Sequence, residues 1–228
     1  YLSDATQGVN IRNNLPDPNV VKQLERSTAF PSPILLASTF SPELSYQYAK
    51  AIGEECRAGG IEVLLGPGLN IYRQSQCARN FEYFGEDPYL VGELGKQMIT
   101  SLQKHNLVAT PKHFAVYSIP VGGRDGKTRT DPHVAPREMR TLYIEPFRMA
   151  FQEAGALGVM SSYNDYDGEP ITGSYHFLTE ILRQEWGFKG YVVSDSEAVE
   201  FISSKHKVAN TYEDGIAQAV NAGLNIRT

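Results

Sequence analysis

The chain has 228 residues, of which 41% are hydrophobic and 21% charged, and its net charge is −5 at neutral pH. This length fits one large domain or two small ones, and the composition is that of an ordinary globular protein. The negative charge argues against a nucleic-acid-binding protein, which needs a basic face. No apolar stretch approaches the roughly 18–20 residues of a membrane span, so no membrane partner is predicted.

The sequence contains no pattern typical of a metal or cofactor site. Cys56 and Cys77 form neither a disulfide framework nor a zinc-like spacing, and the five histidines include no HExxH motif. We therefore predict no cofactor. The chain starts at Tyr1 without an initiator methionine and without a signal peptide, so we expect a processed or excised piece of a longer protein.

Apolar runs alternate with segments of helical periodicity along the whole chain. Ser41–Pro42 and Asp87–Pro88 are typical helix starts, because each places a capping side chain before a proline at the first helical position. Pro146 is expected to kink or divide its helix. In chain order we predict a strand at 34–38, a helix from Ser41, a strand at 61–68, a helix from Asp87, a strand at 107–113, a helix at 137–154, a strand at 157–164, a helix at 176–186, a strand at 191–194, a helix at 212–222 and a short apolar run at 223–226.

This alternation predicts an α/β fold with parallel strands. Apolar runs without polar alternation are typical of strands that helices cover on both faces. Six or seven such units fit a TIM-like (β/α) barrel better than a doubly wound sheet, which would need a glycine-rich phosphate turn early in the chain. The segment GPGLN at 66–70 lacks the third glycine and is followed by no clear helix. We therefore predict a TIM-like barrel, with 66–70 as a loop.

Polar residues gather just past the predicted strands. In a parallel barrel the catalytic groups lie at the carboxyl ends of the strands, so this position is the one where a site is expected. Acidic, basic and hydroxyl side chains all occur there, while the strands themselves are apolar. The candidate site residues are Asp4, Arg79, Glu82, Lys112, His113, Tyr163 and Asp195.

Asp4 lies too close to the start of the chain for an independent interpretation, and each of the other six candidates also has a plainer one. Ser194 and Glu197 fit an S-x-x-E capping box, in which case Asp195 only helps to open a helix. The others fit ordinary structural roles as well: a solvated turn for Lys112 and His113, a core tyrosine for Tyr163 and a surface ion pair for Arg79 and Glu82.

As a set, these residues suit the binding of a sugar. Carboxylates, a lysine, a histidine and an arginine are groups that hydrogen-bond the hydroxyls of a polyhydroxylated ring. A strand-end aspartate among them can serve as the nucleophile of a retaining glycosidase, with an acid/base carboxyl about 5–5.5 Å away. Lys112 and Arg79 would favour the ionised form of Asp195.

Several segments resemble, in the same order, those of glycoside hydrolase family 3, which includes β-glucosidases and β-xylosidases. The resemblance covers essentially the whole chain. It implies that residues 1–228 are a partial N-terminal catalytic barrel domain of that family, incomplete at its N-terminus and without the family's second α/β sandwich domain. The segments are SDATQGV (3–9), RNFEYFGEDPYL (79–90), KHF (112–114), REMRTLYIEPF (137–147), MSSYN (160–164) and GFKGYVVSDSEAV (187–199).

The resemblance also implies a role for each candidate residue. Asp195 matches the catalytic nucleophile, and Tyr163 matches a tyrosine that lies against it. Glu82 is expected to orient Arg79 or Lys112. The residues that match ligands of the sugar hydroxyls are Asp4, Arg79, Lys112 and His113.

Three positions depart from the family pattern. Asn10 stands where many members carry an arginine, for which Arg12 is a candidate substitute. Ala78 stands where glycine is usual; if that position has a positive φ, alanine strains it by about 1 kcal/mol or more and displaces Arg79. Ser196 replaces the tryptophan that follows the nucleophile in many glucosidases, which leaves a preference for xylose open.

The largest departure from the family pattern is that the sequence offers no clear candidate for the general acid/base residue. In most members it comes from the second domain, and in a branch specific for N-acetylglucosamine a histidine in a KHFPGHGDT-like segment replaces it. Residues 115–135 lack that motif, and His133 and Asp131 are poorly matched to it. We therefore expect a C-terminal domain outside this chain to supply the acid/base. The resemblance favours an extracellular or periplasmic location, although no residue in the sequence reports export.

The sequence therefore predicts a retaining β-glycosidase that hydrolyses terminal non-reducing β-D-glucosyl residues, or β-D-xylosyl residues, through a covalent intermediate on Asp195. A glycoside phosphorylase and a sugar-binding barrel without turnover remain alternatives. An aldolase-like barrel using Lys112 as a Schiff base is a more distant one, because the adjacent His113 offers no clear desolvation to lower the pKa of the lysine.

Overall fold

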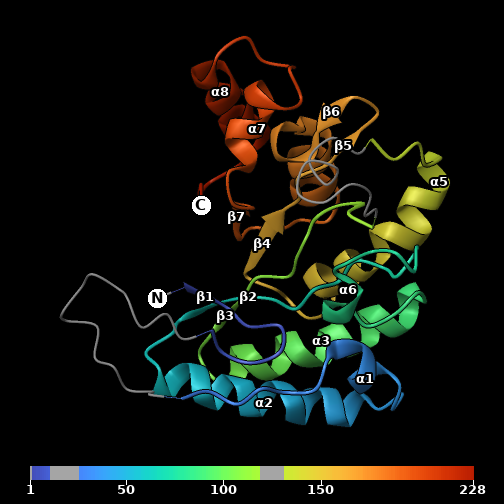
Figure 1. Cartoon of the computed structure of the whole chain (residues 1–228), viewed down its shortest axis with the longest axis vertical. Coiled ribbons are helices and arrows are strands. Elements are labelled where there is room, and N and C mark those ends of the chain that lie inside the picture. Colours follow the sequence, from blue (N-terminus) through green and yellow to red (C-terminus); the bar gives the residue numbers. More distant parts are fainter. Residues whose placement is uncertain (1, 11–25, 119–130) are drawn as a thin grey trace.

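The computed structural model of the chain describes residues 2–10, 26–118 and 131–228. Parallel strands alternate with helices in it, so the predicted α/β fold is confirmed (Figure 1). The strands are β1 (Leu2–Asp4), β2 (Val63–Leu65), β3 (Val108–Ala109), β4 (Gly158–Ser161), β5 (Asp165–Tyr166), β6 (Glu169–Pro170) and β7 (Tyr191–Ser194).

The parallel strands follow one another in space as they do in sequence. β1, β2 and β3 form one sheet in that order, and β4 pairs with β7 in a second sheet. A parallel bridge between Phe114 and Ser161 joins the segment after β3 to β4, and another joins Val193 of β7 to Ile226. The carboxyl ends of these strands therefore lie along one edge. A closed barrel is not found in the described ranges.

Local sequence explains where the two longest helices begin. Ser41 accepts the N–H of Leu44 at the start of α2, and Asp87 accepts the N–H of Leu90 at the start of α3. Each helix then begins with a proline, whose fixed φ suits the first turn. The α-helices are α1 (Pro33–Ala37), α2 (Pro42–Ala58), α3 (Pro88–Lys104), α5 (Pro136–Glu138), α6 (Glu145–Gln152), α7 (Ala198–Ser204) and α8 (Tyr212–Ala222).

Two longer helical segments have π-helical geometry, and short 3₁₀ turns complete the fold. The predicted helix at 137–154 is divided, as Pro146 indicated: a π-helical turn separates α5 from α6, which begins at Glu145. The predicted helix at 176–186 is η4 and is π-helical throughout. The segments are η1 (3₁₀, Asn80–Glu82), η2 (π, Met139–Tyr143), η3 (3₁₀, Ile171–Gly173) and η4 (π, His176–Glu185).

One predicted element is wrong. Residues 34–38 were expected to be a strand but belong mostly to α1, because Ser32 accepts the N–H of Leu35 and Pro33 starts a helix; Leu35 is then 60% exposed. The short apolar run at 223–226 contributes a single bridge, from Ile226 to Val193. The capping box that was the alternative interpretation of Ser194 and Glu197 does not form, because Ser194 is the last residue of β7 and its Oγ accepts the N–H of Thr228.

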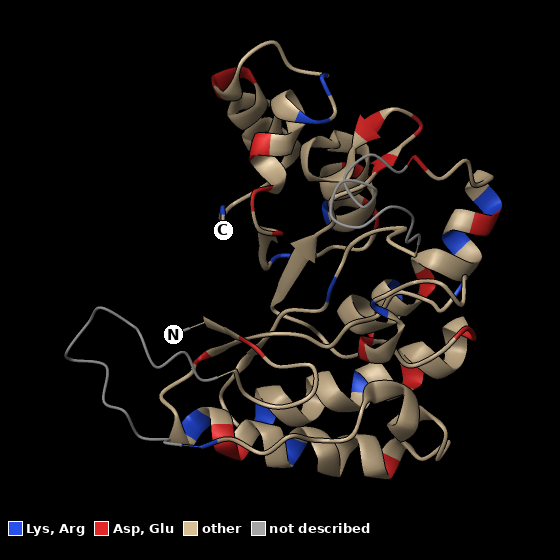
Figure 2. Ribbon diagram, viewed as in Figure 1, with Lys and Arg blue, Asp and Glu red and all other residues tan. Residues whose placement is uncertain are grey.

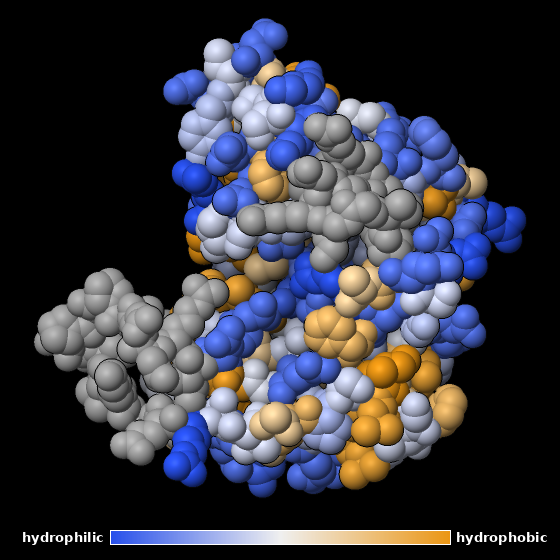
Figure 3. Space-filling view, viewed as in Figure 1, coloured by the Kyte–Doolittle hydropathy of each residue, from blue (hydrophilic) through white to orange (hydrophobic). Residues whose placement is uncertain are grey.

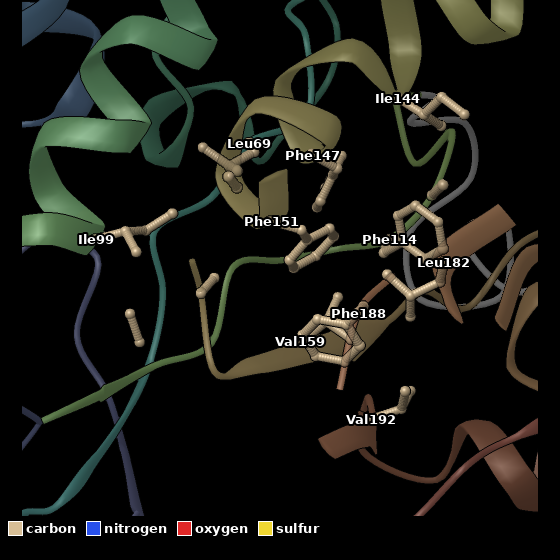
Figure 4. Packing of buried hydrophobic residues seen from close by; sticks show 14 of the residues in the cluster. Leu69, Ile99, Phe114, Ile144, Phe147, Phe151, Val159, Leu182, Phe188 and Val192 are labelled. Carbon is tan, nitrogen blue, oxygen red and sulfur yellow. The ribbon is translucent and has the colours of Figure 1, made fainter. Parts of the chain in front are cut away.

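An aromatic core holds the segment that follows β3. Phe114 is fully buried, and its ring centroid lies 5.3 Å from that of Phe147 and 5.8 Å from that of Trp186. Figure 4 shows Phe114, Phe147 and Phe151 in this core, with Val159 of β4 and Val192 of β7 nearby. Because Phe114 directly follows Lys112 and His113, its burial fixes the backbone of both residues. The Lys112–His113 and Phe114–Ala115 peptide bonds are cis.

Charged residues lie mainly on the helices and loops. Figure 2 shows most of them on the outer helices, whereas β2 and β4 contain no charged residue. A network on one surface joins α3 to α6: Lys96 pairs with Glu93 and Glu153, and Arg148 pairs with Glu145 and Glu153. In the described residues no helix is both long and apolar enough to cross a bilayer.

Candidate active site

Asp195 immediately follows β7, and only one of its two carboxylate oxygens accepts a hydrogen bond; the other is called the open oxygen below. Oδ1 accepts the N–H of Ser196 at 2.8 Å, whereas Oδ2 is buried without a hydrogen-bond partner. Helix α7 begins at Ala198 after Glu197, and its start has no side-chain cap. The interpretation of Asp195 as a helix cap is therefore wrong, and its open oxygen needs another explanation.

Two groups from other segments face this open oxygen. Oδ2 of Asp195 lies 3.6 Å from Nε2 of His113 and 4.0 Å from Nη1 of Arg79. Burial raises the pKa of the Asp195 carboxyl, and Arg79, the N–H of Ser196 and Lys112 oppose that effect without cancelling it. The carboxylate is thus largely removed from water but held beside cationic and hydrogen-bonding groups.

A chain of alternating charges connects Arg79 to the N-terminal strand. Nε of Arg79 donates to Oε1 of Glu82, and Oε2 of Glu82 lies 3.9 Å from Nζ of Lys112. The ammonium of Lys112 also donates to Oδ1 of Asp4, at 2.5 Å. Glu82 and Lys112 are buried, while the side chain of Asp4 is 51% exposed. The sequence predicted that Glu82 orients Arg79 or Lys112; geometrically it lies between the two.

His113 is held by two residues that the sequence did not single out. Its backbone N–H donates to Oδ1 of Asn70, and Nδ2 of Asn70 donates to the carbonyl of His113. The hydroxyl of Tyr83 is hydrogen-bonded to Nδ1 of His113 at 3.0 Å. These contacts orient the ring so that Nε2 faces Asp195. They join residues far apart in sequence, so no local pattern could have indicated them.

Tyr163 lies against the nucleophile candidate, as expected. Its half-buried ring packs beside Phe201 of α7, with centroids 5.7 Å apart. Burial, followed by the nearby Asp195 carboxylate, raises the pKa of the Tyr163 hydroxyl, which therefore stays protonated as a potential donor. Tyr117 also packs beside Tyr163, with ring centroids 6.1 Å apart. The sequence did not identify Tyr117.

Polar contacts thus connect six of the seven predicted residues, from Asp4 through Lys112, Glu82 and Arg79 to Asp195 and His113. Tyr163 lies within electrostatic reach of Asp195. The predicted strain at Ala78 is absent, because Ala78 is exposed and has no positive φ. Asn10 donates its backbone N–H to the carbonyl of Asp4, and Arg12 lies outside the described residues.

A separate groove of about 520 Å³ lies away from these residues. Its apolar part is formed by Ile34, Ala37, Phe84 and Leu90. Figure 3 shows an apolar area over α1, where Leu35 and Phe40 are exposed. None of the seven candidates lines this groove. Among the described residues, no group of three or more His, Cys, Asp or Glu side chains is arranged to hold a metal ion.

Residues 19–227 match the family model described as the glycosyl hydrolase family 3 N-terminal domain. The chain belongs to glycosyl hydrolase family 3. This confirms the family inferred from the sequence segments, and the site lies on the segments that carried that inference.

Named relatives agree with this membership. The chain is 36% identical over 192 residues to β-glucosidase A of Butyrivibrio fibrisolvens, an alignment that covers 84% of this chain and 22% of that protein. It is 40% identical over 173 residues to thermostable β-glucosidase B of Acetivibrio thermocellus, covering 76% of this chain and 22% of that protein. The chain thus spans less than a quarter of the length of these two relatives.

Solved structures of the family have the same fold. β-Glucosidase 3B from Thermotoga neapolitana superposes with a TM-score of 0.83 at 32% identity, over 100% of this chain and 29% of that one. An exo-β-xylosidase of the family superposes with a TM-score of 0.91 at 28% identity, over 99% of this chain and 31% of that one.

Proposed function

We propose that the chain carries the nucleophile and most of the sugar-binding residues of a retaining β-glycosidase, with Asp195 as the nucleophile. The observation that carries this proposal is the open, buried Oδ2 of Asp195, which faces both His113 and Arg79. A buried carboxylate oxygen without a partner is costly unless a ligand uses it. Family membership supports the glycosidase class, and the relatives named above are called β-glucosidases or a β-xylosidase.

In this mechanism Oδ2 of Asp195 attacks the anomeric carbon of the terminal sugar. The glycosidic bond breaks as an acid protonates the leaving oxygen, and a covalent glycosyl-enzyme forms; water activated by the same acid/base group then releases the sugar. Arg79 and Lys112 keep Asp195 ionised against the effect of burial. Lys112, His113, Arg79 and Asp4 donate to or accept from sugar hydroxyls, while Glu82 holds the two cations in place.

The acid/base group is proposed to lie outside these 228 residues. Two carboxylates near Asp195 already have partners, because Glu82 accepts from Arg79 and Asp4 accepts from Lys112. Neither is therefore available as a proton donor. We accordingly place the acid/base on a second, C-terminal domain of the natural protein. We also propose that the parallel array from β1 to Ile226 is part of a TIM-like barrel domain spanning 1–228, because its strands pair in chain order.

The proposed substrate is a terminal, non-reducing β-D-glucosyl residue, with β-D-xylosyl as the second choice. Ser196 leaves the position after the nucleophile exposed and without an aromatic platform, so the site offers less steric discrimination between a hexose and a pentose.

The test is hydrolysis of 4-nitrophenyl β-D-glucoside and β-D-xyloside by the full natural polypeptide and by its Asp195→Asn variant. Asp167→Asn is the matched control, because Asp167 is exposed at a turn with a positive φ that asparagine also tolerates. Loss of turnover confined to Asp195→Asn, with the β-anomer released first by the wild type, supports the proposal. Near wild-type kcat in Asp195→Asn contradicts it. Glycosyl phosphate formed in phosphate buffer would indicate a phosphorylase instead.

A further inference from the structure

Tyr117 is a buried residue that packs against several residues of the candidate site but has no part in the mechanism proposed above. It lies four residues after His113, on the segment that follows β3, and is 5% exposed. Its ring touches three of the seven candidates. The ring centroid lies 5.1 Å from that of His113 and 6.1 Å from that of Tyr163, and Cζ of Arg79 lies 5.7 Å from the ring centroid.

The hydroxyl of Tyr117 does not contribute to this packing. It is buried and has no hydrogen-bond partner. A buried hydroxyl without a partner costs stability relative to phenylalanine, which would fill almost the same space without a polar atom. Packing around Arg79 and His113 therefore explains an aromatic ring at this position but leaves the oxygen unexplained.

The surroundings of the hydroxyl point to the reacting centre. Burial raises the pKa of the Tyr117 hydroxyl; Arg79 lowers it and Asp195 raises it further, so both charges lie within electrostatic reach. The hydroxyl thus stays protonated and can donate a hydrogen bond. Oδ2 of Asp195 is likewise buried without a hydrogen-bond partner. Two open polar atoms therefore belong to one cluster, and a polyhydroxylated ligand bound there would satisfy both.

We propose that Tyr117 is a further substrate-binding residue, whose hydroxyl forms a hydrogen bond with a hydroxyl group of the sugar bound against Asp195. The inference rests on the proposed glycosidase function and adds a direct sugar contact to it. The ring keeps Arg79, His113 and Tyr163 in position before the sugar arrives, and the hydroxyl acquires its partner only in the complex.

The chain supplies a matched control for this idea. Tyr212, at the start of α8, also has a buried hydroxyl without a partner and an arginine over its ring, with Cζ of Arg227 5.3 Å from the centroid. Among the described residues, no hydrogen bond, ion pair or ring contact joins Tyr212 to the candidate site. Replacing either tyrosine by phenylalanine removes a buried hydroxyl without a partner. A loss of activity in Tyr117→Phe alone would therefore come from the place of that hydroxyl in the candidate site.

The experiment compares Tyr117→Phe with Tyr212→Phe in the full natural polypeptide, using 4-nitrophenyl β-D-glucoside and its 2-, 3-, 4- and 6-deoxy analogues. We expect Tyr117→Phe to lower kcat/KM for the parent glucoside by about ten-fold or more, and to lose much less on the one analogue that lacks the contacted hydroxyl. Both variants should melt at or above the wild-type temperature, and Tyr212→Phe should keep wild-type kcat/KM.

Two results would overturn the inference: wild-type kcat/KM in Tyr117→Phe, or an equal loss on the parent and all four analogues, which would limit Tyr117 to a positioning role. A wild type that hydrolyses none of these glycosides would instead count against the proposed function. In that case calorimetric titration with glucose and xylose decides the inference, because weaker binding by Tyr117→Phe supports it and unchanged affinity contradicts it.

Discussion

The guanidinium of Arg79 donates to Glu82 on one side and lies 4.0 Å from Oδ2 of Asp195 on the other. Arg79 therefore links the buried carboxylate at the end of β7 to the charge chain that runs through Glu82 to Lys112. Since burial raises the pKa of Asp195 and Arg79 lowers it, the position of this one cation bears directly on the pH at which the carboxyl ionises.

Removing the charge of Arg79 should move the acid limb of the kcat/KM profile to higher pH. The nucleophile must be ionised, so activity rises as pH passes its pKa; Arg79 lowers that pKa, and Arg79→Gln should therefore raise it. Loss of the cation also leaves the negative charge of Glu82 less compensated, which acts in the same direction. Arg73→Gln is the control, since Arg73 is exposed and pairs with Glu138. An acid limb at the same pH in both variants would mean that Arg79 does not act on Asp195.

Asp195→Asn should stabilise the protein at neutral pH. The pKa of the Asp195 carboxyl is higher in the folded than in the unfolded chain, so ionisation destabilises the folded state at a pH above the folded value. At a pH below the pKa of the unfolded chain, Asp195 is protonated in both the folded and the unfolded state, so this penalty vanishes. The variant should therefore melt a few degrees above wild type at pH 7, and the difference should shrink as the pH falls through the folded pKa. A difference that does not change with pH would show that another effect is responsible.

Lys112→Met should lower kcat/KM by about 10- to 100-fold, because it removes the proposed charged donor to the substrate and leaves Asp4 and Glu82 without their shared partner. Lys96→Met provides the comparison: Lys96 also pairs with two carboxylates, Glu93 and Glu153, but at the α3–α6 surface. If both substitutions changed kcat/KM equally and only slightly, Lys112 would have no role in catalysis and would be an ordinary residue of a turn.

Ala78→Gly should leave activity unchanged, because the strain considered at this position is absent. Ala78 is exposed without a positive φ, so glycine relieves no strain and only increases the freedom of the unfolded chain. We expect a loss of about 0.4–1 kcal/mol in the free energy of unfolding, with kcat/KM unchanged. An increase in kcat/KM would mean that the methyl group does disturb Arg79.

Sequence reasoning worked where a feature depended on strand position. Asp195 was expected at the end of a strand and directly follows β7, because a residue just past an apolar run can be located from the sequence. Sequence reasoning failed where a helix-capping motif opposed the apolar pattern. The run at 34–38 has the composition of a strand, but the cap and proline at Ser32–Pro33 start α1.

Residues whose role depends on distant partners were missed altogether. Asn70 was assigned only to a loop, yet its side chain binds both backbone groups of His113. Tyr83 and Tyr117 look like ordinary core aromatics in the sequence, and only the folded chain places them against His113. The same limit applies to the capping box at Ser194 and Glu197, since the contact of Ser194 with Thr228 could not be foreseen.

The most direct test of the central claim is covalent trapping of the nucleophile. The full natural polypeptide would be incubated with 2-deoxy-2-fluoro-glucosyl and 2-deoxy-2-fluoro-xylosyl donors that carry highly activated leaving groups, then digested and analysed by mass spectrometry. We predict one fluorosugar per chain on the peptide that contains Asp195, and no label in Asp195→Asn. A stable label on another carboxylate, or hydrolysis of these donors with no label at Asp195, would contradict the assignment of Asp195 as the nucleophile.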